Sequence, residues 1–492
     1  MKSPFDRPWV SVLLSINEFR RFCRETEEQE ATGAAEIRLD LWHEALPEEE
    51  LKGLKVPVIF TWRKGVQARE AARRKLLKSA ARGDLGPCWI DLDRDDPLLG
   101  ELLAMPELKA KIIASVHLQT TFCDSELQQI CADLQQPGVA AMKVVLQERA
   151  LGAVRQALRF VSIPCPIPLA VFVAGVSGSV SRLLAIQEGS AWSYGRLPGS
   201  PGSDPGQPVS SQLQKRFAGR FLHSPPQQRF AVLGSDVRRS LSPAYHNALL
   251  DLERRDAQFL DISLQDPGDI LASDESLSLA GLAVTAPHKK WARATVPPGP
   301  GVLEEFPSWN TLMRDEGGEW WGTNTDGPAV VALLEDGSPA ARRVAILGGG
   351  GTALAAAVSL RHGGHDVALV VRAAEQQQEI QSVHGFRCGG EEVLKNVDAL
   401  INATGAGRTA ADPLPWNLDL FRGHQVLEVC YEPLETEFLR QFKDRATCTS
   451  GAQFFSEQAR RQAKILYGAE VSREQSWAWT EAALQLLAQD PL

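Results

Sequence analysis

The stretch of residues 344–372 constrains the fold of this 492-residue chain more than any other segment. It reads VAILGGGGTALAAAVSLRHGGHDVALVVR: an apolar run, a glycine cluster, a helical stretch with small residues on one face, and a second apolar run. Gly348, Gly350 and Ala353 occupy the small-residue positions where backbone N–H groups at a helix N-terminus can approach a pyrophosphate. Because the cluster lies inside a predicted βαβ unit, it indicates a Rossmann dinucleotide site, and the alternative is an ordinary glycine-rich turn.

The end of the second apolar run indicates which dinucleotide binds. A carboxylate at this point accepts hydrogen bonds from the ribose 2′-hydroxyl of NAD and repels a 2′-phosphate. The run ends instead in Val371 and Arg372, and a guanidinium offers a planar set of donors to phosphate. The sequence therefore predicts NADP(H), unless Arg372 is only a solvated surface charge.

The first 200 residues contain eight short β-rich runs, separated by stretches with helical spacing. This alternation predicts a (β/α)8 TIM barrel rather than a sandwich, and the active site of such a barrel lies at the C-terminal ends of its strands. The runs are 10–14, 36–41, 56–62, 88–92, 111–116, 141–146, 168–173 and 191–194.

Lys143 is the most informative polar residue in these runs. It interrupts the sequence AAMKVVL, where burying an ammonium group is costly. A buried lysine gives up its proton more readily, and the free amine can form a Schiff base with a carbonyl substrate. His117 would then act as general acid and base, with Glu36 orienting it. The alternatives are a snorkelling lysine at a strand end and a structural histidine.

The composition excludes several classes of protein. A net charge of −9 predicts neither a nucleic-acid nor an anionic membrane partner. The eight cysteines show no CxxC and no paired Cys/His spacing, so we expect no disulfide framework and no metal site. The apolar run 10–14 is too short for a signal peptide, and no stretch is long enough to cross a bilayer, so we expect the cytoplasm.

Six motifs within residues 8–215 resemble type I 3-dehydroquinate dehydratase. They are EIRLD (36–40), FTWR (60–63), KIIASVH (111–117), AMKVV (141–145), SVSR (179–182) and SDPGQ (203–207). The resemblance implies that Lys143 forms the Schiff base, while His117 takes the α-proton and assists loss of the hydroxyl as water. It makes Glu36 the partner of His117. It also implies five residues that hold the substrate's carboxylate and hydroxyls: Arg38, Arg63, Arg182, Ser203 and Gln207.

Two segments depart from this family. The third-strand arginine is usually followed by Glu-Gly-Gly, whereas this chain reads RKGVQARE, so we expect that contact to be missing or moved to Gln67 or Glu70. The fifth strand commonly ends in His-Asp-Phe, whereas His117 is followed here by Leu-Gln. Because neither change removes Lys143 or His117, we expect dehydratase activity.

A second ordered set of motifs, from residue 230 to about 465, resembles shikimate dehydrogenase. Besides the glycine segment it comprises GSDVRRSLSPAYHN (234–247), VTAPHKK (284–290), WNTL (309–312), GTNTDG (322–327), INATG (401–405), YEPLETEFL (431–439) and GAQFFSEQA (451–459). The resemblance implies that Lys289 and Asp326 move a proton at a carbinol oxygen while hydride is exchanged with NADP. It assigns substrate binding to Ser240, Ser242, Thr285, Asn310, Tyr431 and Gln458, and cofactor binding also to Gly351 and Thr404. Val371 and Ala373 flank Arg372 where the family has Asn and Thr, so we expect only a modest preference for NADP.

The two resemblances together predict one chain that carries two consecutive reactions. We expect the dehydratase barrel at 1–222, a linker at 223–229, a shikimate-binding domain at 230–332 completed by helices at 456–492, and the Rossmann domain at 333–455. The tract 198–211 has the composition of a linker, but the resemblance makes it an active-site loop.

The expected partners are small molecules: 3-dehydroquinate, 3-dehydroshikimate and shikimate. Two alternatives stay open from the sequence. The C-terminal half is a quinate or shikimate dehydrogenase that uses NAD, or one half is a non-catalytic module.

Overall fold

The computed structural model describes residues 5, 7–63, 69–119, 122–147, 151–217, 219, 224–271, 277–335 and 342–490. The chain divides into two compact units. The first comprises residues 1–229, 235–278 and 485–492, and the second comprises residues 230–234 and 279–484. In this division residues 235–278 group with the N-terminal part. Of the expected linker at 223–229, residue 223 lies outside the described residues, and residues 228 and 229 already begin a strand.

The first unit contains the predicted barrel. All eight β-rich runs are strands, joined in the order β7-β6-β5-β4-β3-β2-β1-β8, and every neighbouring pair is parallel. The Ala191 amide, just before β8, donates to the Leu169 carbonyl of β7, so the two end strands meet and the barrel is nearly closed. The strands are β1 (Trp9–Leu13), β2 (Ala34–Arg38), β3 (Val58–Thr61), β4 (Cys88–Asp93), β5 (Lys111–Leu118), β6 (Val139–Leu146), β7 (Leu169–Val173) and β8 (Ser193–Arg196).

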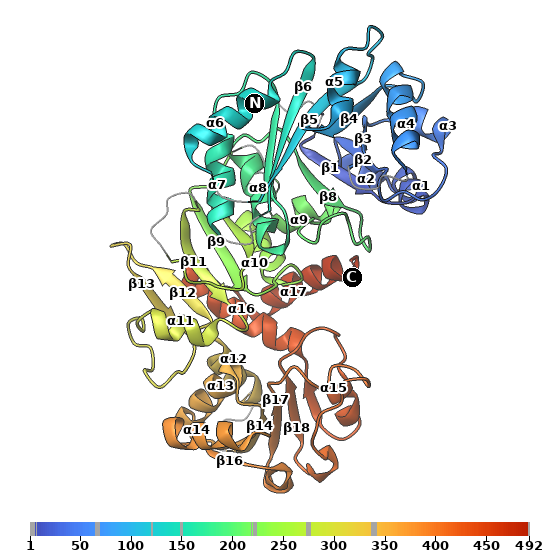
Figure 1. Ribbon diagram of the computed structural model, residues 1–492. Coiled ribbons are helices and arrows are strands. Elements are labelled where there is room, and N and C mark those ends of the chain that lie inside the picture. The colour runs from blue at the N-terminus through green and yellow to red at the C-terminus, as the bar shows by residue number, and fades with distance from the viewer. Residues whose placement is uncertain are drawn as a thin grey trace. The chain divides into compact units, whose positions relative to one another are not determined.

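Helices lie between successive strands of this barrel, and one more helix follows β8 (Figure 1). Their sequences show the usual boundary signals. The Ser15 side chain caps the first helix by accepting a hydrogen bond from the Glu18 amide. The Asp96 side chain caps the helix that begins at Pro97 by accepting from the Leu98 amide. The helices are α1 (Ile16–Arg24), α2 (Thr26–Ala31), α3 (Glu48–Lys52), α4 (Glu70–Arg82), α5 (Pro97–Leu103), α6 (Asp124–Leu134), α7 (Leu151–Val161), α8 (Ser179–Gln187) and α9 (Leu213–Phe217).

The inner face of the barrel changes from apolar to polar along its strands. Because side chains alternate along a strand, Trp89, Asp91 and Asp93 share one face of β4, and Ala141 and Lys143 share one face of β6. Trp89 and Ala141 belong to the hydrophobic cluster that fills the interior, whereas the polar residues come later on each strand. The strands thus deliver charged side chains to the carboxyl end of the barrel, where such enzymes have their active sites.

The strand register brings three of these strands level with one another. Ser115 of β5 is the partner of Asp93 on β4 and of Lys143 on β6. His117 lies two residues further along β5 and therefore on the same face as Ser115.

The rest of the first unit includes α10 (Ser242–Leu252) and β10 (Ala257–Ser263). Asn247 ties them together, because its side chain donates to the Phe259 carbonyl at 2.7 Å and accepts from the Phe259 amide at 2.8 Å. Near the other end of this unit, the Asp490 carboxylate accepts from the Arg196 guanidinium at 2.9 Å and from the Gly199 amide at 2.9 Å. The loop that follows β8 is thereby anchored at its start.

The second unit begins with a mixed sheet. Strands β9 (Gln228–Gly234), β11 (Leu279–Val284), β12 (Thr311–Arg314) and β13 (Trp320–Thr323) are neighbours in that order, and β12 is antiparallel to β11 and β13. Helices α11 (Lys289–Thr295) and α12 (Asp326–Leu334) follow β11 and β13 in the chain.

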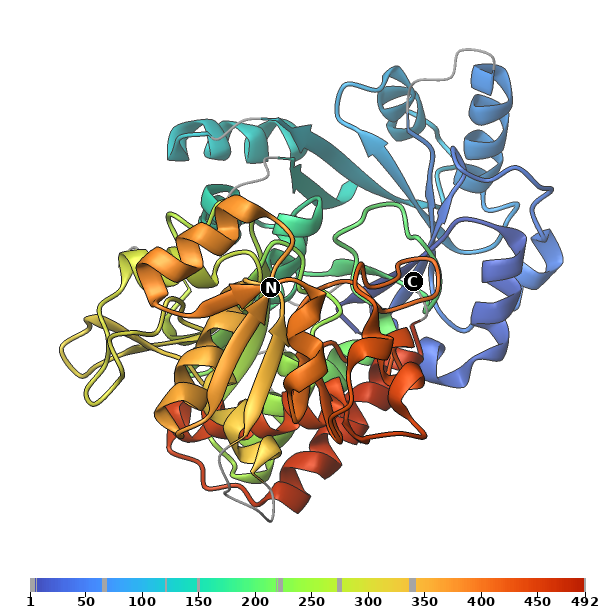
Figure 2. The ribbon, with the colours of Figure 1, turned by 90° about the horizontal axis from the view of Figure 1, so that it is seen from below.

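A six-stranded parallel sheet completes this unit and confirms the predicted Rossmann fold. Its order is β16-β15-β14-β17-β18-β19, with the strand order reversing at β14. Figures 1 and 2 show these strands side by side with helices next to them. The elements are β14 (Arg343–Leu347), α13 (Gly351–His362), β15 (Asp366–Val370), α14 (Ala374–His384), β16 (Arg387–Gly389), β17 (Ala399–Asn402), β18 (Gln425–Glu428), α15 (Glu437–Phe442), β19 (Thr447–Thr449), α16 (Gly451–Tyr467) and α17 (Arg473–Ala488).

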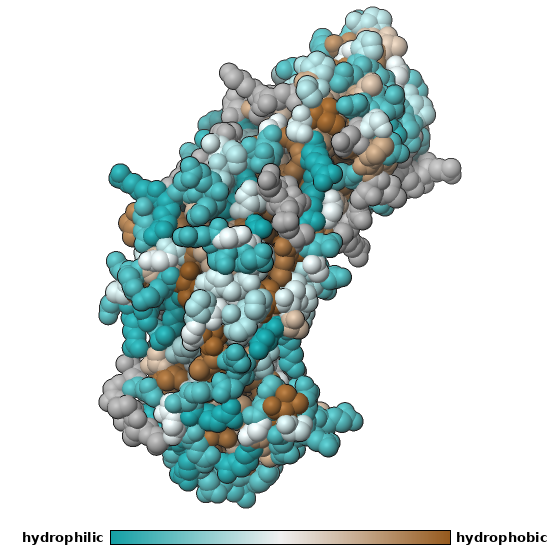
Figure 3. All heavy atoms as spheres, turned by 90° about the vertical axis from the view of Figure 1, so that its left-hand side faces the viewer, coloured by the Kyte–Doolittle hydropathy of each residue, from teal (hydrophilic) through white to brown (hydrophobic). Residues whose placement is uncertain are grey.

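Hydrophilic residues cover most of the face that Figure 3 shows, and hydrophobic residues form small groups among them. Of the helices in the described ranges, none combines the length and the apolar content needed to cross a bilayer.

Candidate active sites

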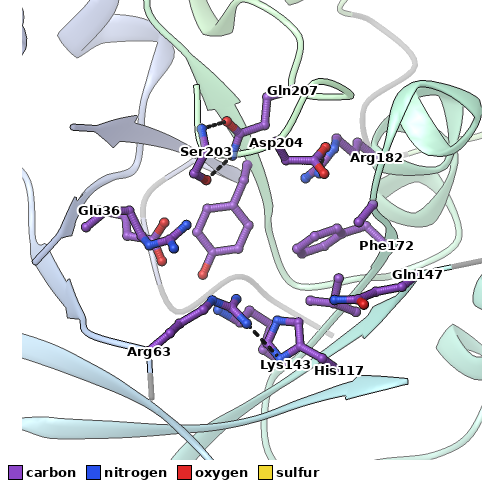
Figure 4. A pocket seen from close by; sticks show the side chains of 14 residues that line it. Glu36, Arg63, His117, Lys143, Gln147, Phe172, Arg182, Ser203, Asp204 and Gln207 are labelled. Atoms are coloured by element: carbon purple, nitrogen blue, oxygen red, sulfur yellow. Dashed lines mark hydrogen bonds and ion pairs between the residues drawn. The ribbon is translucent and has the colours of Figure 1, made fainter. Parts of the chain in front are cut away.

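A cavity of about 250 Å³ opens in the barrel and gathers every residue that the dehydratase resemblance implied. Figure 4 shows Lys143, His117 and Arg63 close together on one side of it. The cavity is lined by Glu36, Arg38, Arg63, His117, Lys143, Val145, Gln147, Phe172, Ala174, Arg182, Tyr194, Ser203, Asp204 and Gln207.

Lys143 is buried and paired. Its side chain is 2% exposed, and its ammonium contacts the carboxylate of Asp91, which is 1% exposed. Its Nζ also lies 5.2 Å from the centre of the Tyr194 ring. The amine therefore lies beside a carboxylate at the wall of the cavity, where a carbonyl group of a bound substrate could reach it.

His117 contacts two charged groups through one nitrogen. Its Nδ1 lies 2.9 Å from Asp93 Oδ1 and 2.9 Å from Arg63 Nη1. Its Nε2 is buried and has no hydrogen-bond partner among the described residues. Burial lowers the pKa of His117, and the nearby charges of Arg63 and Lys143 act in the same direction, while the hydrogen bond to Asp93 opposes them.

Glu36 lies in the cavity, but its hydrogen-bond partner is Thr61 rather than His117. Its carboxylate accepts a hydrogen bond from the Thr61 hydroxyl at 2.7 Å. On the same strand, Arg38 donates to Asp40 at 2.7 and 3.0 Å. The side chains of Glu36 and Arg38 share a face of β2, since the two residues are two positions apart.

Arg182 has unused donors inside the cavity. It is 1% exposed, and its Nη2 donates to Asp204 at 2.9 Å, whereas Nε and Nη1 have no partner among the described residues. Burial lowers the pKa of this guanidinium. Its carbon Cζ lies 4.3 Å from the centre of the Phe172 ring. Free N–H groups on a buried arginine are suited to an anionic ligand such as a carboxylate.

The tract 198–211 contributes to the cavity, as an active-site loop would. The Ser203 amide donates to Gln207 Oε1 at 2.9 Å, and Gln207 Nε2 donates to the Ser203 hydroxyl at 3.2 Å (Figure 4). These bonds present both side chains at the cavity wall.

Gln67 and Glu70 are the two residues to which the sequence allows the Glu-Gly-Gly contact to have moved. Gln67 lies outside the described residues. Glu70 begins α4 and pairs with Arg73 at 3.2 Å and with Arg74 at 3.0 Å.

Sequence reasoning missed four residues at this site: Asp91, Asp93, Tyr194 and Asp204. The signal for the two carboxylates on β4 was present, because the run IDLD ends a predicted strand and polar residues at such ends belong to the active site. Tyr194 also ends a predicted run. Its hydroxyl is buried without a partner among the described residues, and burial raises the pKa of the phenol well above its usual value, so the hydroxyl keeps its proton.

The second unit joins Lys289 and Asp326, as the shikimate dehydrogenase resemblance implied. Lys289 Nζ lies 2.6 Å from Asp326 Oδ2 and 2.9 Å from the Thr352 hydroxyl, and this hydroxyl lies 3.0 Å from Asp326 Oδ2. Thr352 belongs to the first turn of α13, directly after the glycine cluster. The predicted catalytic pair therefore touches the predicted cofactor site through Thr352, which sequence reasoning missed.

Further hydrogen bonds hold Asp326 in place. Asn310 donates to Asp326 Oδ1 at 2.7 Å and to the Thr325 hydroxyl at 2.8 Å. Gln458 lies 3.5 Å from the same Thr325 hydroxyl. Two of the predicted substrate residues, Asn310 and Gln458, thus join the catalytic pair in one network.

The other predicted substrate residues are placed singly. Thr285 follows β11 and is partly exposed, and Tyr431 follows β18, where its ring lies 5.6 Å from that of Phe455. Ser240 and Ser242 belong to the first unit, where the Ser242 amide donates to the Ser240 hydroxyl at 3.2 Å at the start of α10.

The glycine cluster leaves open space at the start of α13. Gly348 has a φ of +107°, which favours glycine, and a Cβ there would lie 3.0 Å from Thr404 Cγ2. A Cβ on Gly350 would meet no atom within 4 Å, so open space lies in front of the α13 N-terminus, next to Gly351 and Ala353. Backbone N–H groups at this end suit a pyrophosphate. Arg372 follows β15 and is exposed.

No group of three or more His, Cys, Asp or Glu side chains in the described ranges is arranged to hold a metal ion.

Comparisons with known proteins match both parts of the chain. The profile of type I 3-dehydroquinase matches residues 11–222, and that of the shikimate dehydrogenase substrate binding domain matches residues 232–296. The bifunctional 3-dehydroquinate dehydratase/shikimate dehydrogenase of Arabidopsis thaliana, described as chloroplastic, is 26% identical over 92% of this chain and 81% of its own length. The NADP(+) shikimate dehydrogenase of Methanosarcina mazei is 31% identical over 53% of this chain and 96% of its own length.

Among solved structures, shikimate 5-dehydrogenase of Thermus thermophilus in complex with NADP(H) and shikimate is 26% identical. It matches 52% of this chain and 99% of its own, with a TM-score of 0.47.

The fold and the two sites define a class: an α/β enzyme with a lysine-bearing barrel followed by a Rossmann oxidoreductase. The chain belongs to the shikimate dehydrogenase family, and its N-terminal part is a type I 3-dehydroquinase domain.

Proposed function

We propose that this chain converts 3-dehydroquinate to shikimate in two consecutive reactions. The barrel dehydrates 3-dehydroquinate to 3-dehydroshikimate, and the C-terminal part reduces that ketone with NADPH. The observation that carries the first reaction is the cavity in which a buried lysine and a histidine with a free nitrogen meet.

In the dehydratase, Lys143 and His117 carry the chemistry. The neutral amine of Lys143 attacks the substrate ketone, and the resulting carbinolamine takes up one proton from solvent and loses water to form an iminium. His117 takes the proton from the adjacent carbon, and the electrons of that C–H bond pass to the iminium nitrogen. His117 then returns this proton to the leaving hydroxyl, which departs as water, and hydrolysis of the new iminium releases 3-dehydroshikimate and Lys143.

The remaining cavity residues bind and orient the substrate in this proposal. Arg182 and Arg63 supply N–H groups to the carboxylate, and Arg38 adds a third guanidinium. Ser203 and Gln207 contact the ring hydroxyls from the loop after β8, and Glu36 supports the site from β2.

In the reductase, Lys289 and Asp326 handle the proton. NADPH, when bound, would supply the hydride for the ketone carbon. Lys289 donates a proton to the oxygen that becomes the new hydroxyl, and Asp326 holds the ammonium 2.6 Å away. Asn310 donates to Asp326 and holds it in place. The proposed substrate contacts are Ser240, Ser242, Thr285, Asn310, Tyr431 and Gln458.

The cofactor is NADP(H). The residues present fit it, because the turn at Gly348 and Gly350 leaves open space in front of a helix N-terminus. We assign the 2′-phosphate to Arg372 and further contacts to Gly351, Ala353 and Thr404.

We also propose a cytoplasmic location and the domain borders expected from the sequence. The eight cysteines are free thiols, which suits a reducing compartment.

The borders can be tested with two separate chains, one that ends near residue 223 and one that starts near Gln228. Activity of both chains supports them.

Trapping the covalent intermediate tests the dehydratase site. Borohydride added during turnover should reduce the iminium and leave one substrate-derived adduct on the peptide that contains Lys143. An adduct on another lysine would overturn the assignment.

For the reductase site, Lys289→Ala should lower turnover of 3-dehydroshikimate about 10²- to 10⁴-fold and leave the dehydratase rate unchanged.

A further inference from the structure

The two partners of His117 compete for one nitrogen. Asp93 Oδ1 and Arg63 Nη1 each lie 2.9 Å from Nδ1. A carboxylate oxygen only accepts hydrogen bonds, and a guanidinium N–H only donates them. Nδ1 can serve Asp93 only when it carries a proton, and it can serve Arg63 only when it does not. The two contacts therefore belong to different tautomers of the ring.

The other ring nitrogen shows which tautomer the reaction needs. Nε2 is buried and has no partner among the described residues, and His117 lines the substrate cavity. A buried nitrogen left unsatisfied in a cavity is available to a ligand. With the neutral ring protonated at Nδ1, Nε2 holds a lone pair and can accept a proton from the substrate. With the proton on Nε2, the ring has no base to offer at this place.

We propose that Asp93 is the positioning residue that keeps the proton of His117 on Nδ1, so that Nε2 is the atom that takes and returns the substrate's proton. This inference rests on the proposed dehydratase reaction. When Nε2 accepts the proton, the ring becomes a cation, and the carboxylate of Asp93 balances its charge. The N–H groups of Arg63 turn to the substrate's carboxylate, which removes the competitor from Nδ1.

The strand positions explain how this carboxylate reaches the histidine. Asp93 ends β4, and its register partner Ser115 precedes His117 by two residues on β5. The sequence lacks the Glu-Gly-Gly element after Arg63, and Glu36 accepts its bond from Thr61. The carboxylate that touches His117 thus comes from β4, where the resemblance gave no reason to expect it.

The charges around the pair support the same arrangement. Three charged groups face His117: Asp93 from β4, Arg63 after β3 and Lys143 from β6. Burial alone would raise the pKa of Asp93, but the hydrogen bond and charge of His117, together with Arg63 and Lys143, lower it to about 2. Asp93 is therefore ionised throughout the working pH range and stays an acceptor.

The variant Asp93→Asn in the full chain tests the proposal, because it keeps the shape and removes the charge. The kcat for dehydration should fall about 10²-fold while KM changes less than about threefold. Because Asp93 raises the pKa of His117, the acidic limb of the profile of kcat/KM against pH should move to lower pH. A purely structural role would lower activity without moving this limb. Asp93→Glu should restore part of the rate.

Asp133→Asn is the matched control, since this exposed carboxylate pairs with Arg94, the residue after Asp93, at 3.4 Å. It should leave the rate and the pH profile unchanged. Borohydride should still trap the adduct on Lys143 in Asp93→Asn. A kcat within about threefold of the unmodified protein, or an acidic limb that does not move, overturns the role of Asp93. Failure of the unmodified protein to form the Lys143 adduct would instead overturn the proposed function.

Discussion

Removing the charge of Lys143 should destabilise the barrel as well as stop its chemistry. Lys143 and Asp91 are 2% and 1% exposed, and they form an ion pair inside the barrel. Breaking a buried pair by removing one partner typically costs about 3–5 kcal/mol, because the other charge stays buried without compensation. We therefore expect Lys143→Met to lower the stability of the barrel by about this amount.

The double variant Lys143→Met/Asp91→Asn separates the charge from the volume. It removes both charges and leaves a buried amide, whose unsatisfied groups cost about 1–3 kcal/mol. The double variant should therefore be more stable than the single one. Lys111→Met is the control, because this exposed lysine on β5 has no buried carboxylate partner in the described structure and should change stability by less than about 1 kcal/mol.

Hydrogen exchange followed by mass spectrometry suits a chain with two units, because it reports the free energy of opening for each segment. Peptides from β4, β5 and β6 should lose protection in Lys143→Met and regain part of it in the double variant. Peptides from the six-stranded sheet serve as the internal reference. Equal protection in the single variant and the unmodified protein, or no recovery in the double variant, would refute the reasoning.

Three further predictions concern single residues. Tyr194→Phe keeps the ring contact with Phe172 at 5.4 Å but removes the hydroxyl. The KM for 3-dehydroquinate should therefore rise about 3- to 10-fold. An unchanged KM would show that the hydroxyl does not contact the substrate. Arg372→Asp should raise KM for NADPH at least about tenfold relative to KM for NADH, and an unchanged ratio would place the phosphate site elsewhere. Burial raises the pKa of Glu428 to about 7 from 4.5, so the second unit should lose about 3 kcal/mol of stability as pH rises through that window. In thermal unfolding from pH 4.5 to 8, Glu428→Gln should flatten this slope, and an identical slope would contradict the assignment.

The local pattern of the sequence predicted the architecture well. All eight β-rich runs are strands, and the glycine segment forms the turn between β14 and α13 of the parallel sheet. These features could be predicted because strand alternation and glycine placement are properties of short segments. The residues implied by the dehydratase resemblance all line the barrel cavity. Of those implied by the shikimate dehydrogenase resemblance, Asp326, Asn310 and Gln458 join Lys289 in one hydrogen-bond network.

The partners of these residues were harder to predict, because they depend on the register between strands. Asp93 and Lys143 both flank Ser115, but they lie 50 residues apart in the chain, and no local pattern joins them. Thr352 was missed for a similar reason. Its contact with Lys289 joins the start of α13 to the start of α11, and α11 follows a strand of a different sheet.

One assay tests the central claim that both reactions belong to this chain. The purified protein is given 3-dehydroquinate and NADPH, and the enone absorbance of 3-dehydroshikimate and the consumption of NADPH are followed together. We predict that the enone appears first and that one NADPH is then consumed for each 3-dehydroquinate lost. With Lys143→Met, neither signal should appear from 3-dehydroquinate, while 3-dehydroshikimate added directly should still consume NADPH. Enone that accumulates without any loss of NADPH, or no enone at all from the unmodified protein, would contradict the account.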